Sequence, residues 1–549
     1  MVVPAVMRRV LARNKLFAAV LIPAFLLRVD AELGYRWQSW FNDSWDYMDT
    51  AVTLKLDPVR PSGYSLYLFL LRPFHSLALV TISQHLMGLL VAVMIYALAR
   101  RRFNAPAWVA VLATLPVLFD GFEIQLEHLI MSDTLFLFLA MLAITLLLWN
   151  PRPSWPVCLL AGLLLGLSST VRSTGLPLIA VFVVYLAIRY LLDGRWVSGV
   201  IGLAACLSAF AVPLLGYASW YDAQHGQFTM SESTGVFLYS RVMTFAECSK
   251  MNPPTNLLPL CTTVPPDKRP IAQAYIWAQA SPLNRFPAPK FSPLPNSLAG
   301  KFAEKAIESQ PLDYARTVFD DTSRVFDWQR TVFPNPATYD EYLFGYDSVL
   351  VAGGHAAGGY PSSAQAYLAG GNPLTQVVNP FAAIIRVYQR YAWLPGTVYG
   401  LILLVGLIGI ARRWRRGGGE ALLPWLCSVA LIVTPAATAE FDYRYVTTAV
   451  PFACLAAAMA FWRRSDDRQA ADEASAVEAS GASGASGAPV ASGVSGASGT
   501  SALGVGAGAT AGGEPGRAPG LPRRVPGGGP GGGAADAGHD QRDLAPDAP

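Results

Sequence analysis

The chain has 549 residues, of which 53% are hydrophobic and 14% are charged, whereas soluble domains carry about 25% charged residues. Its net charge of +4 is too small to indicate a nucleic-acid partner, and the basic residues cluster beside apolar runs. The composition therefore excludes a soluble domain and predicts an all-α polytopic membrane protein.

About ten apolar segments predict transmembrane helices, because a helix needs roughly 20 apolar residues to cross a hydrocarbon core of about 30 Å. Their approximate ranges are 14–29, 78–99, 105–120, 129–149, 155–171, 175–192, 197–219, 393–411, 421–438 and 445–462. The first segment is short, and residues 29–31 after it also fit a signal-peptidase site. A cleaved signal peptide therefore stays an alternative to a first span.

Basic residues at the ends of these segments predict the orientation. Under alternating topology the clusters at 8–15, 100–102, 412–416 and 463–464 fall on the same side of the membrane. The positive-inside rule makes that side cytoplasmic. Both termini are then predicted in the cytoplasm.

Four regions follow from this topology. Residues 1–219 form an N-terminal membrane module of seven spans with an external loop at 30–77, and residues 220–392 form a small, irregular external domain. Residues 393–464 hold the last spans, and the Gly/Ala/Ser/Pro-rich residues 465–549 are predicted to be a disordered cytoplasmic tail.

The predicted external domain has two recognisable parts. Apolar spacing across 301–328 predicts helix interrupted at Pro311, and the Gly-rich run 353–371 predicts a mobile loop.

The six cysteines fall into two groups. Cys248 and Cys261 lie in the polar segment between membrane parts, where an oxidising compartment would allow a disulfide; two unpaired thiols are the alternative. The others are expected to be small buried hydrophobes inside apolar runs: Cys158, Cys206, Cys427 and Cys454.

An acidic cluster, FNDSWDYMDT at 41–50, follows the first predicted span. In a helix Asp46 and Asp49 would share a face with Asn42, while Asp43 would lie on a neighbouring face. For Asp46 and Asp49 we favour a solvated interfacial helix with aromatic residues at headgroup level.

Two further clusters lie beside predicted spans. Arg60 in VRPSGY precedes a proline, which favours an extended backbone at the membrane interface, and it suits either a lipid phosphate or generic headgroup contact. Glu127 lies one helical turn after Glu123. Asp133 follows inside an apolar run, where a carboxylate usually marks function; a packing hydrogen bond is the alternative.

Two arginines depart from the positive-inside trend, Arg172 in VRSTG and Arg444 in FDYRY. Guanidinium groups suit phosphate oxygens in a bidentate mode. The alternative is an ion pair with Glu440, Asp442 or Asp133. External carboxylates with external arginines predict a site that holds a lipid-linked phosphate and activates an acceptor.

Other functions are weighed against this one. No P-loop, dinucleotide fingerprint, HExxH motif or nucleophile elbow occurs in a credible context. A secondary transporter or lipid flippase of the cell envelope is the main alternative, although the sequence shows no internal repeat. An envelope assembly protein would explain the external segment but not Asp43 with the two arginines.

The stretches NDSWDY, RPSGY, LEHLIMSDTLFLFL, VRSTGLPL and YRYVTTAVPF resemble the polytopic C-type (GT-C) glycosyltransferases. More narrowly, they are similar to bacterial polyprenyl-phosphate-dependent enzymes of the protein mannosyltransferase and lipid A aminoarabinose transferase kind. The resemblance covers roughly residues 10–462. It implies an inverting hexosyl or pentosyl transfer from a polyprenyl-phosphate donor to a protein, glycolipid or glycan acceptor, at the external face of a bacterial inner membrane.

The resemblance also assigns residues. Asp43 corresponds to the family's acidic group in the first external loop, and Glu127, with Asp133 as runner-up, to its second acidic position. Arg172 and Arg444 correspond to the arginines that grip carrier phosphate, and Arg60 is a weaker candidate. Many relatives carry paired acids where this chain has Asp43 followed by serine. No cofactor is therefore assigned, and a mechanism without metal fits as well as one that uses a divalent metal.

Overall fold

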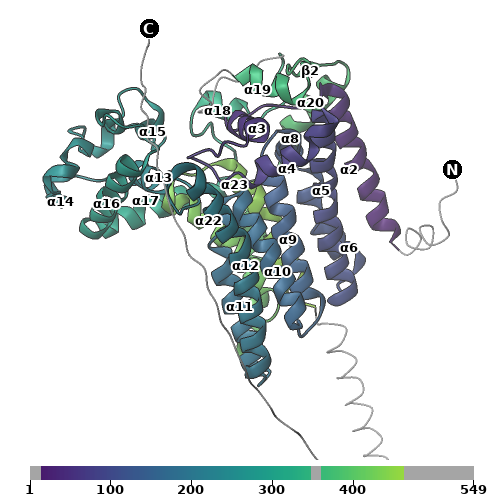
Figure 1. Ribbon diagram of the computed structural model, residues 1–549. Helices are drawn as coiled ribbons and strands as arrows, with labels where there is room; N and C mark the ends of the chain where they lie inside the picture. The colour runs from purple at the N-terminus through teal and green to yellow at the C-terminus, as the bar shows by residue number, and fades with distance from the viewer. Residues whose placement is uncertain (1–13, 348–359, 463–549) are drawn as a thin grey trace, which may run out of the picture. The chain divides into compact units, whose positions relative to one another are not determined.

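The computed structural model describes residues 14–347 and 360–462, and these residues are almost entirely helical (Figure 1). Their one sheet joins β1 (Tyr35–Arg36) to β2 (Gln376–Val377) in antiparallel register. The predicted all-α architecture is confirmed. The C-terminal basic cluster, most of the N-terminal one and the predicted tail lie outside the described residues.

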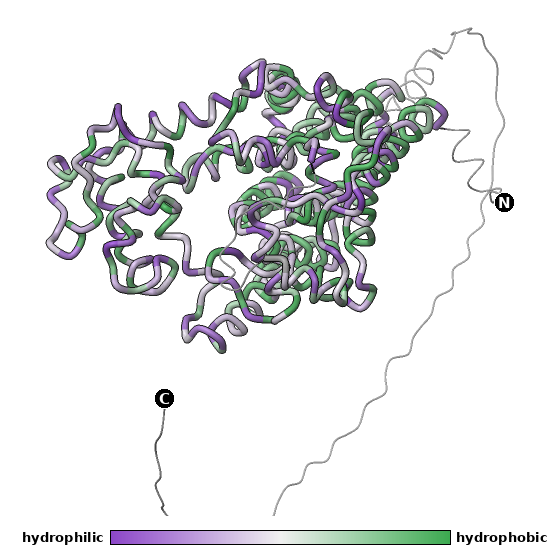
Figure 2. Tube along the Cα trace, turned by 90° about the horizontal axis from the view of Figure 1, so that it is seen from above, coloured by the Kyte–Doolittle hydropathy of each residue, from purple (hydrophilic) through white to green (hydrophobic). Residues whose placement is uncertain are grey.

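A bundle of helices forms the body of the structure, with α10 packed between α9 and α12 and with α22 packed against α23. Its helices are α2 (Lys15–Gly34), α5 (Leu77–Ala97), α6 (Ala107–Leu112), α7 (Leu115–Phe119), α9 (Asp133–Trp149), α10 (Trp155–Val171), α11 (Leu178–Leu192), α12 (Trp196–His225), α21 (Gly396–Arg412), α22 (Leu422–Thr438) and α23 (Tyr443–Met459). Figure 2, which views the molecule from above, shows hydrophobic residues gathered in the helical coils of the bundle.

Within the described residues, three helical stretches are long and apolar enough to cross a membrane: Leu77–Arg102, Ser173–Leu192 and Trp196–His225. A fourth would come from α20 (Phe381–Tyr391) and α21, which are bent by 61°. α9, α10 and α22 are shorter apolar helices. Every predicted span contains a helix, and the protein is multi-pass, but the count of ten stays a prediction.

One predicted span is interrupted. The segment expected as a single helix over 105–120 forms α6 and α7, with a break at Ala113 and Thr114. Pro116 lies in the first turn of α7, and its missing N–H and ring favour the start of a helix over its interior. The Thr114 hydroxyl donates to the Val111 carbonyl at 2.7 Å and so occupies a carbonyl at the break.

Short elements cover the end of the bundle that carries α3, hereafter the loop end. They are α3 (Ser44–Thr53), α4 (Gly63–Leu71), α8 (Gly121–His128), α18 (Pro336–Asp340), α19 (Tyr360–Tyr367) and α20. The short 3-10 or π turns in and around the bundle are η1 (Arg72–Phe74), η2 (Leu98–Arg102), η3 (Ser173–Gly175), η7 (Arg324–Phe326) and η8 (Trp414–Arg416).

The predicted Gly-rich loop is partly wrong, because its residues 360–367 form α19. This helix packs on α3, and the Ser363 hydroxyl donates to Asp49 at 2.7 Å. The rest of that run up to residue 359 lies outside the described residues.

Residues 234–309 form a lateral part with its own apolar core, built on Val236, Tyr239, Phe302 and Ala303. Its elements are α13 (Thr234–Val242), α14 (Cys248–Met251), η4 (Thr255–Leu260), η5 (Pro266–Lys268), α15 (Ala274–Trp277), η6 (Pro282–Arg285) and α16 (Pro293–Ser309). α17 (Pro311–Ser323) follows after Gln310, so the predicted interruption at Pro311 is confirmed.

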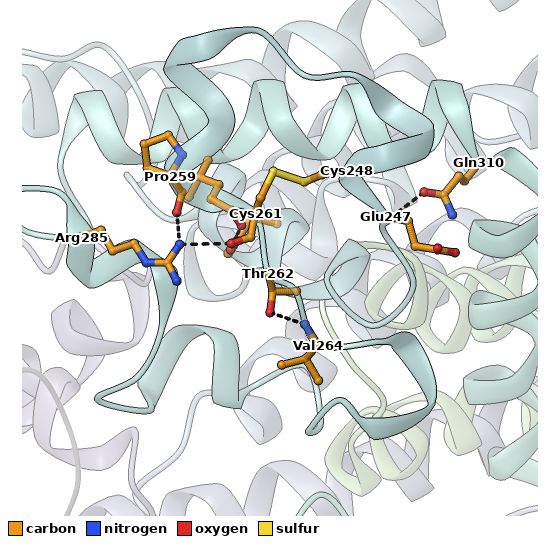
Figure 3. Close-up of a disulfide and its surroundings, with 10 residues drawn as sticks. Glu247, Cys248, Pro259, Cys261, Thr262, Val264, Arg285 and Gln310 are labelled. Carbon is orange, nitrogen blue, oxygen red and sulfur yellow. Dashed lines mark hydrogen bonds between the residues drawn. A yellow bond between two sulfur atoms is a disulfide. The ribbon is translucent and has the colours of Figure 1, made fainter.

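The structure joins Cys248 and Cys261 in a disulfide within this part (Figure 3). Arg285 donates to the Pro259 and Cys261 carbonyls at 2.7 and 3.1 Å, which anchors the same turn. The four remaining cysteines are free and buried in the bundle, as expected of small hydrophobes.

Close helix packing in the bundle depends on glycine. A Cβ atom added at Gly162 of α10 would lie 2.1 Å from the Cys206 carbonyl oxygen of α12, so a side chain there would push two backbones apart. We expect Gly162→Leu to lower the free energy of unfolding by about 1–3 kcal/mol or more. Gly216→Leu on α12 is the control, because nothing lies within 4 Å of its Cβ position. Equal melting temperatures for the two purified variants would contradict this packing.

Candidate functional site

A cavity of about 670 Å³ opens at the loop end, between the bundle and the lateral part. Its polar lining comes from segments far apart in the sequence and includes Asn42, Asp43, Tyr47, Arg60, Arg172, Ser173, Ser233, Gln273, Asn335, Thr338, Glu440, Asp442 and Arg444. Topology alone placed Asp43, Arg60, Arg172 and Arg444 on one side of the membrane, and the structure brings all four into one cavity.

Asp43 is the centre of the charged group. It precedes α3 and is buried, with 6% of its surface exposed. Its Oδ1 accepts a bond from Arg60 Nη2 at 2.6 Å, and its Oδ2 accepts one from Arg444 Nη1 at 2.7 Å. Burial by itself raises the pKa of Asp43, but the guanidinium groups of Arg60 and Arg444 outweigh it and hold the pKa well below its usual range.

The prediction of a solvated Asp46 is wrong. This side chain is buried, and its Oδ2 accepts a bond from Arg60 Nη1 at 2.5 Å. Arg60 therefore bridges two carboxylates of the same acidic cluster, which raises its own pKa despite burial. The two ion pairs fix the plane of its guanidinium at the cavity wall.

Arg172 and Arg444 come from different helix ends. Arg172 is the extended C-cap of α10, and Arg444 lies in the first turn of α23. Their guanidinium groups lie 5.5 and 5.4 Å from the centre of the same ring, that of Tyr445. Two cations therefore approach one part of the cavity from two helices.

Asp133 does not line the cavity. It begins α9, is fully buried, and forms an ion pair with Arg172. Arg444 likewise contacts Asp442, its Nε lying 3.2 Å from an Asp442 oxygen. The ion pairs weighed as alternatives are thus present, and they hold both arginines in place beside the cavity.

Glu127 is separate from this site, which corrects its expected place beside Asp43. Its two oxygens accept bonds from Arg28 Nε and Nη2, each at 2.7 Å, and His85 Nδ1 lies 2.7 Å from Oε2. Glu127 does not line the cavity, so it is out of reach of an acceptor bound there.

Gly63, the last but one residue of the RPSGY stretch, begins α4 at a point where the chain passes close to the end of α10. A Cβ there would lie 2.6 Å from the Thr170 backbone, two residues before Arg172. The glycine therefore lets the chain that carries Arg60 approach the end of α10 that carries Arg172.

Two glutamates beside the site have raised pKa values and were not predicted. Burial raises the pKa of Glu440, on the cavity wall, to about 7, although its oxygens accept bonds from the Ala272 and Gln273 amides. Burial also raises the pKa of Glu341 to about 8, and this side chain accepts a bond from the Asn42 amide at 3.0 Å.

These glutamates predict a pH dependence of stability. At pH values between about 4.3, the pKa of an exposed glutamate, and the raised pKa values of these two groups, the folded protein holds protons that the unfolded chain has lost. Stability therefore falls as pH rises through this window. We expect Glu341→Gln to reduce the fall in melting temperature between about pH 5 and 8. The exposed Glu304→Gln is the control, and an unchanged slope for Glu341→Gln would contradict the burial of that carboxyl.

The donor set around Asp43 does not suit a divalent cation, because both its oxygens are bound by guanidinium groups. The expectation of a metal-free site stays a prediction.

The helical bundle with a charged cavity at one end defines a polytopic membrane protein whose cavity lining can bind an anion. Residues 72–240 match the family model described as dolichyl-phosphate-mannose-protein mannosyltransferase. This segment includes Arg172 but not Asp43, Arg60 or Arg444. No curated protein matches the sequence.

Three solved structures show remote likeness. The S. cerevisiae protein O-mannosyltransferase complex bound to its sugar donor is 15% identical, with 44% of this chain and 36% of that chain covered and a TM-score of 0.32. The Archaeoglobus fulgidus oligosaccharyltransferase is 13% identical, with 80% of this chain and 48% of that chain covered and a TM-score of 0.36. ArnT from Cupriavidus metallidurans, bound to undecaprenyl phosphate, is 14% identical, with 82% of this chain and 77% of that chain covered and a TM-score of 0.31.

The chain spans less than half of the first two of these structures. Because all three TM-scores are below 0.5, we base no functional inference on them.

Proposed function

We propose that this protein transfers a sugar from a polyprenyl-phosphate donor to an acceptor at the external face of a bacterial inner membrane. One observation carries the proposal: Asp43 lies between Arg60 and Arg444 in a cavity that Arg172 also lines. This arrangement supplies a carboxylate and several cations to one reacting centre.

The reaction requires both kinds of group. The acceptor oxygen or nitrogen attacks the anomeric carbon while the bond from that carbon to the phosphate oxygen breaks. The phosphate leaves with the electron pair as polyprenyl phosphate, and the acceptor proton passes to the Asp43 carboxylate. Attack from the face opposite the leaving phosphate inverts the anomeric configuration.

Arg172 and Arg444 stabilise the departing phosphate, because guanidinium groups already fixed by carboxylates need no reorientation as negative charge develops. Asp133 and Asp442 are positioning residues that hold those guanidinium groups.

Phosphate binding also changes Asp43. Arg444, one of the arginines that lower its pKa, would divide its charge between Asp43 and the phosphate. The pKa of Asp43 then rises toward the working pH, which makes it a better proton acceptor.

The membrane provides the donor's environment, and the lateral part provides a wall of the cavity. The polyprenyl chain lies among lipids and apolar helix faces, while Gln273 and Trp277 of the lateral part line the cavity. We assign acceptor selection to this wall. The acceptor is a protein, a glycolipid or a glycan.

The test uses the full chain in lipid nanodiscs with radiolabelled polyprenyl-phosphate hexoses and pentoses, and with envelope protein, glycolipid and glycan fractions as acceptors. We expect label to move from at least one donor to one acceptor fraction. Absence of transfer from every donor, together with lipid or solute flux in proteoliposomes, would replace the enzyme by a transporter or flippase.

A further inference from the structure

Three side chains from three helices meet outside the charged cavity. They are Glu32 of α2, His85 of α5 and His128 of α8, and none of them lines the cavity. His85 Nε2 and His128 Nδ1 lie 3.2 Å apart, and Glu32 Oε1 lies 3.7 Å from each of these nitrogens. Both histidines are buried, with 4% and 0% of their surfaces exposed.

The outer contacts fix the tautomer of both histidines. Both Glu127 oxygens accept bonds from Arg28, and His85 Nδ1 lies 2.7 Å from Oε2 and donates to it. His128 Nε2 lies 2.8 Å from the Tyr35 carbonyl, which only accepts. The protons of both neutral rings are therefore on the outer nitrogens, and the two inner nitrogens present lone pairs to each other.

Glu32 adds a third acceptor to this group. Its side chain is 12% exposed, and neither of its oxygens accepts a hydrogen bond of normal geometry from the described residues. The neighbouring Thr81 hydroxyl is 3.0 Å from the Trp37 carbonyl and donates there instead. A carboxylate and two imidazole lone pairs thus converge on one point, an arrangement that a bound cation would satisfy.

The geometry fits a transition metal. A point equidistant from the three inner atoms lies about 2.1 Å from each of them, within the range of Zn–N and Zn–O bonds. Two imidazoles with one carboxylate favour Zn²⁺ over Mg²⁺ or Ca²⁺, which prefer oxygen ligands. Histidine ligands of metals usually donate their other N–H to a carboxylate or a carbonyl, as both do here.

We propose that Glu32, His85 and His128 bind one Zn²⁺ ion, with a fourth position open to water. The ion joins α2, α5 and α8. It also fixes the first external loop, because the Ser39 amide donates to the His128 carbonyl and the Ile130 amide donates to the Ser39 carbonyl, each at 3.1 Å. The same loop leads to Asp43, so the ion supports the cavity from outside.

The test measures zinc in the untagged full chain, purified in detergent and dialysed against ZnCl₂ and then buffer. We expect about one zinc per chain by elemental mass spectrometry, and loss of most of it in His85→Gln, His128→Gln and Glu32→Gln. His225→Gln is the control, because this histidine is exposed at the end of α12. Less than about a tenth of an equivalent in the wild type, or equal zinc in all variants, would overturn the site.

A second measurement needs no variant and stands if the variants fail to fold. Chelation should lower the melting temperature of the wild type, and Zn²⁺ but not Mg²⁺ should restore it. Co²⁺ in place of Zn²⁺ should give the visible absorption of a tetrahedral site. A melting temperature unaffected by chelator and zinc, with no cobalt spectrum, would exclude metal binding here.

Discussion

Asp43→Asn is expected to reduce the rate of sugar transfer by roughly 10²–10⁴-fold, the contribution of a positioned general base. Asparagine keeps the shape of the side chain and one of its oxygens, but it takes no proton from the acceptor. It also removes the charge that Arg60 and Arg444 share. The loss should appear in kcat at saturating donor and acceptor, while the affinity for polyprenyl phosphate stays equal or increases.

Asp49→Asn is the matched control for this experiment. Asp49 belongs to the same acidic cluster and lies in α3, which Asp43 precedes, yet it accepts a bond from Ser363 and does not line the cavity. We expect it to retain most of the activity. Full activity in Asp43→Asn, or equal losses in the two variants, would remove Asp43 from the chemistry.

Arg444→Gln is expected to have the second large effect, a loss of about 10²–10³-fold in kcat/KM for the donor, because one cation of the departing phosphate disappears. Arg444→Lys should recover only part of this loss, since an ammonium group cannot form the planar, paired contacts of a guanidinium. Binding of polyprenyl phosphate should weaken in parallel.

The exposed Arg390 on α20 supplies the control for total charge, as Arg390→Gln. Unchanged donor kinetics in Arg444→Gln would contradict phosphate binding at this position. If donor affinity is unchanged and only stability falls, Arg444 serves merely to neutralise Asp43 and Asp442.

The sequence predicted the site's cationic residues because they violate a topological rule. Arg172 and Arg444 lie where the positive-inside trend disfavours arginine, and the structure pairs them with Asp133, Asp43 and Asp442. Charge placement in a membrane protein is costly, so such departures are informative without an alignment.

The spacing of residues in the sequence did not predict contacts between side chains that are far apart in the chain. Glu127 was expected beside Asp43, but Arg28, which binds it, is 99 residues away, and no local pattern indicates that contact. Asp46 was expected in solvent for the same reason, because only the fold brings Arg60 over it. The pKa values of Glu341 and Glu440 also depend on burial created by segments remote from each residue.

The positions of the helices were predicted well, because a long apolar run in the sequence directly indicates a helix. The continuity of the helices was predicted less well. Pro116 divides one predicted span, and residues 360–367 form a helix inside an expected loop. Tertiary packing against α3 stabilises that short helix in a segment whose glycines disfavour it.

The most direct test of the proposed function is a mass balance of the donor. Purified protein in nanodiscs receives a labelled polyprenyl-phosphate sugar and an acceptor fraction, and both the glycosylated product and the free polyprenyl phosphate are quantified over time. We predict equal amounts of the two products from the wild type, and neither from Asp43→Asn. Intact donor at the end of the reaction, or release of polyprenyl phosphate that Asp43→Asn leaves unchanged, would contradict sugar transfer at this site.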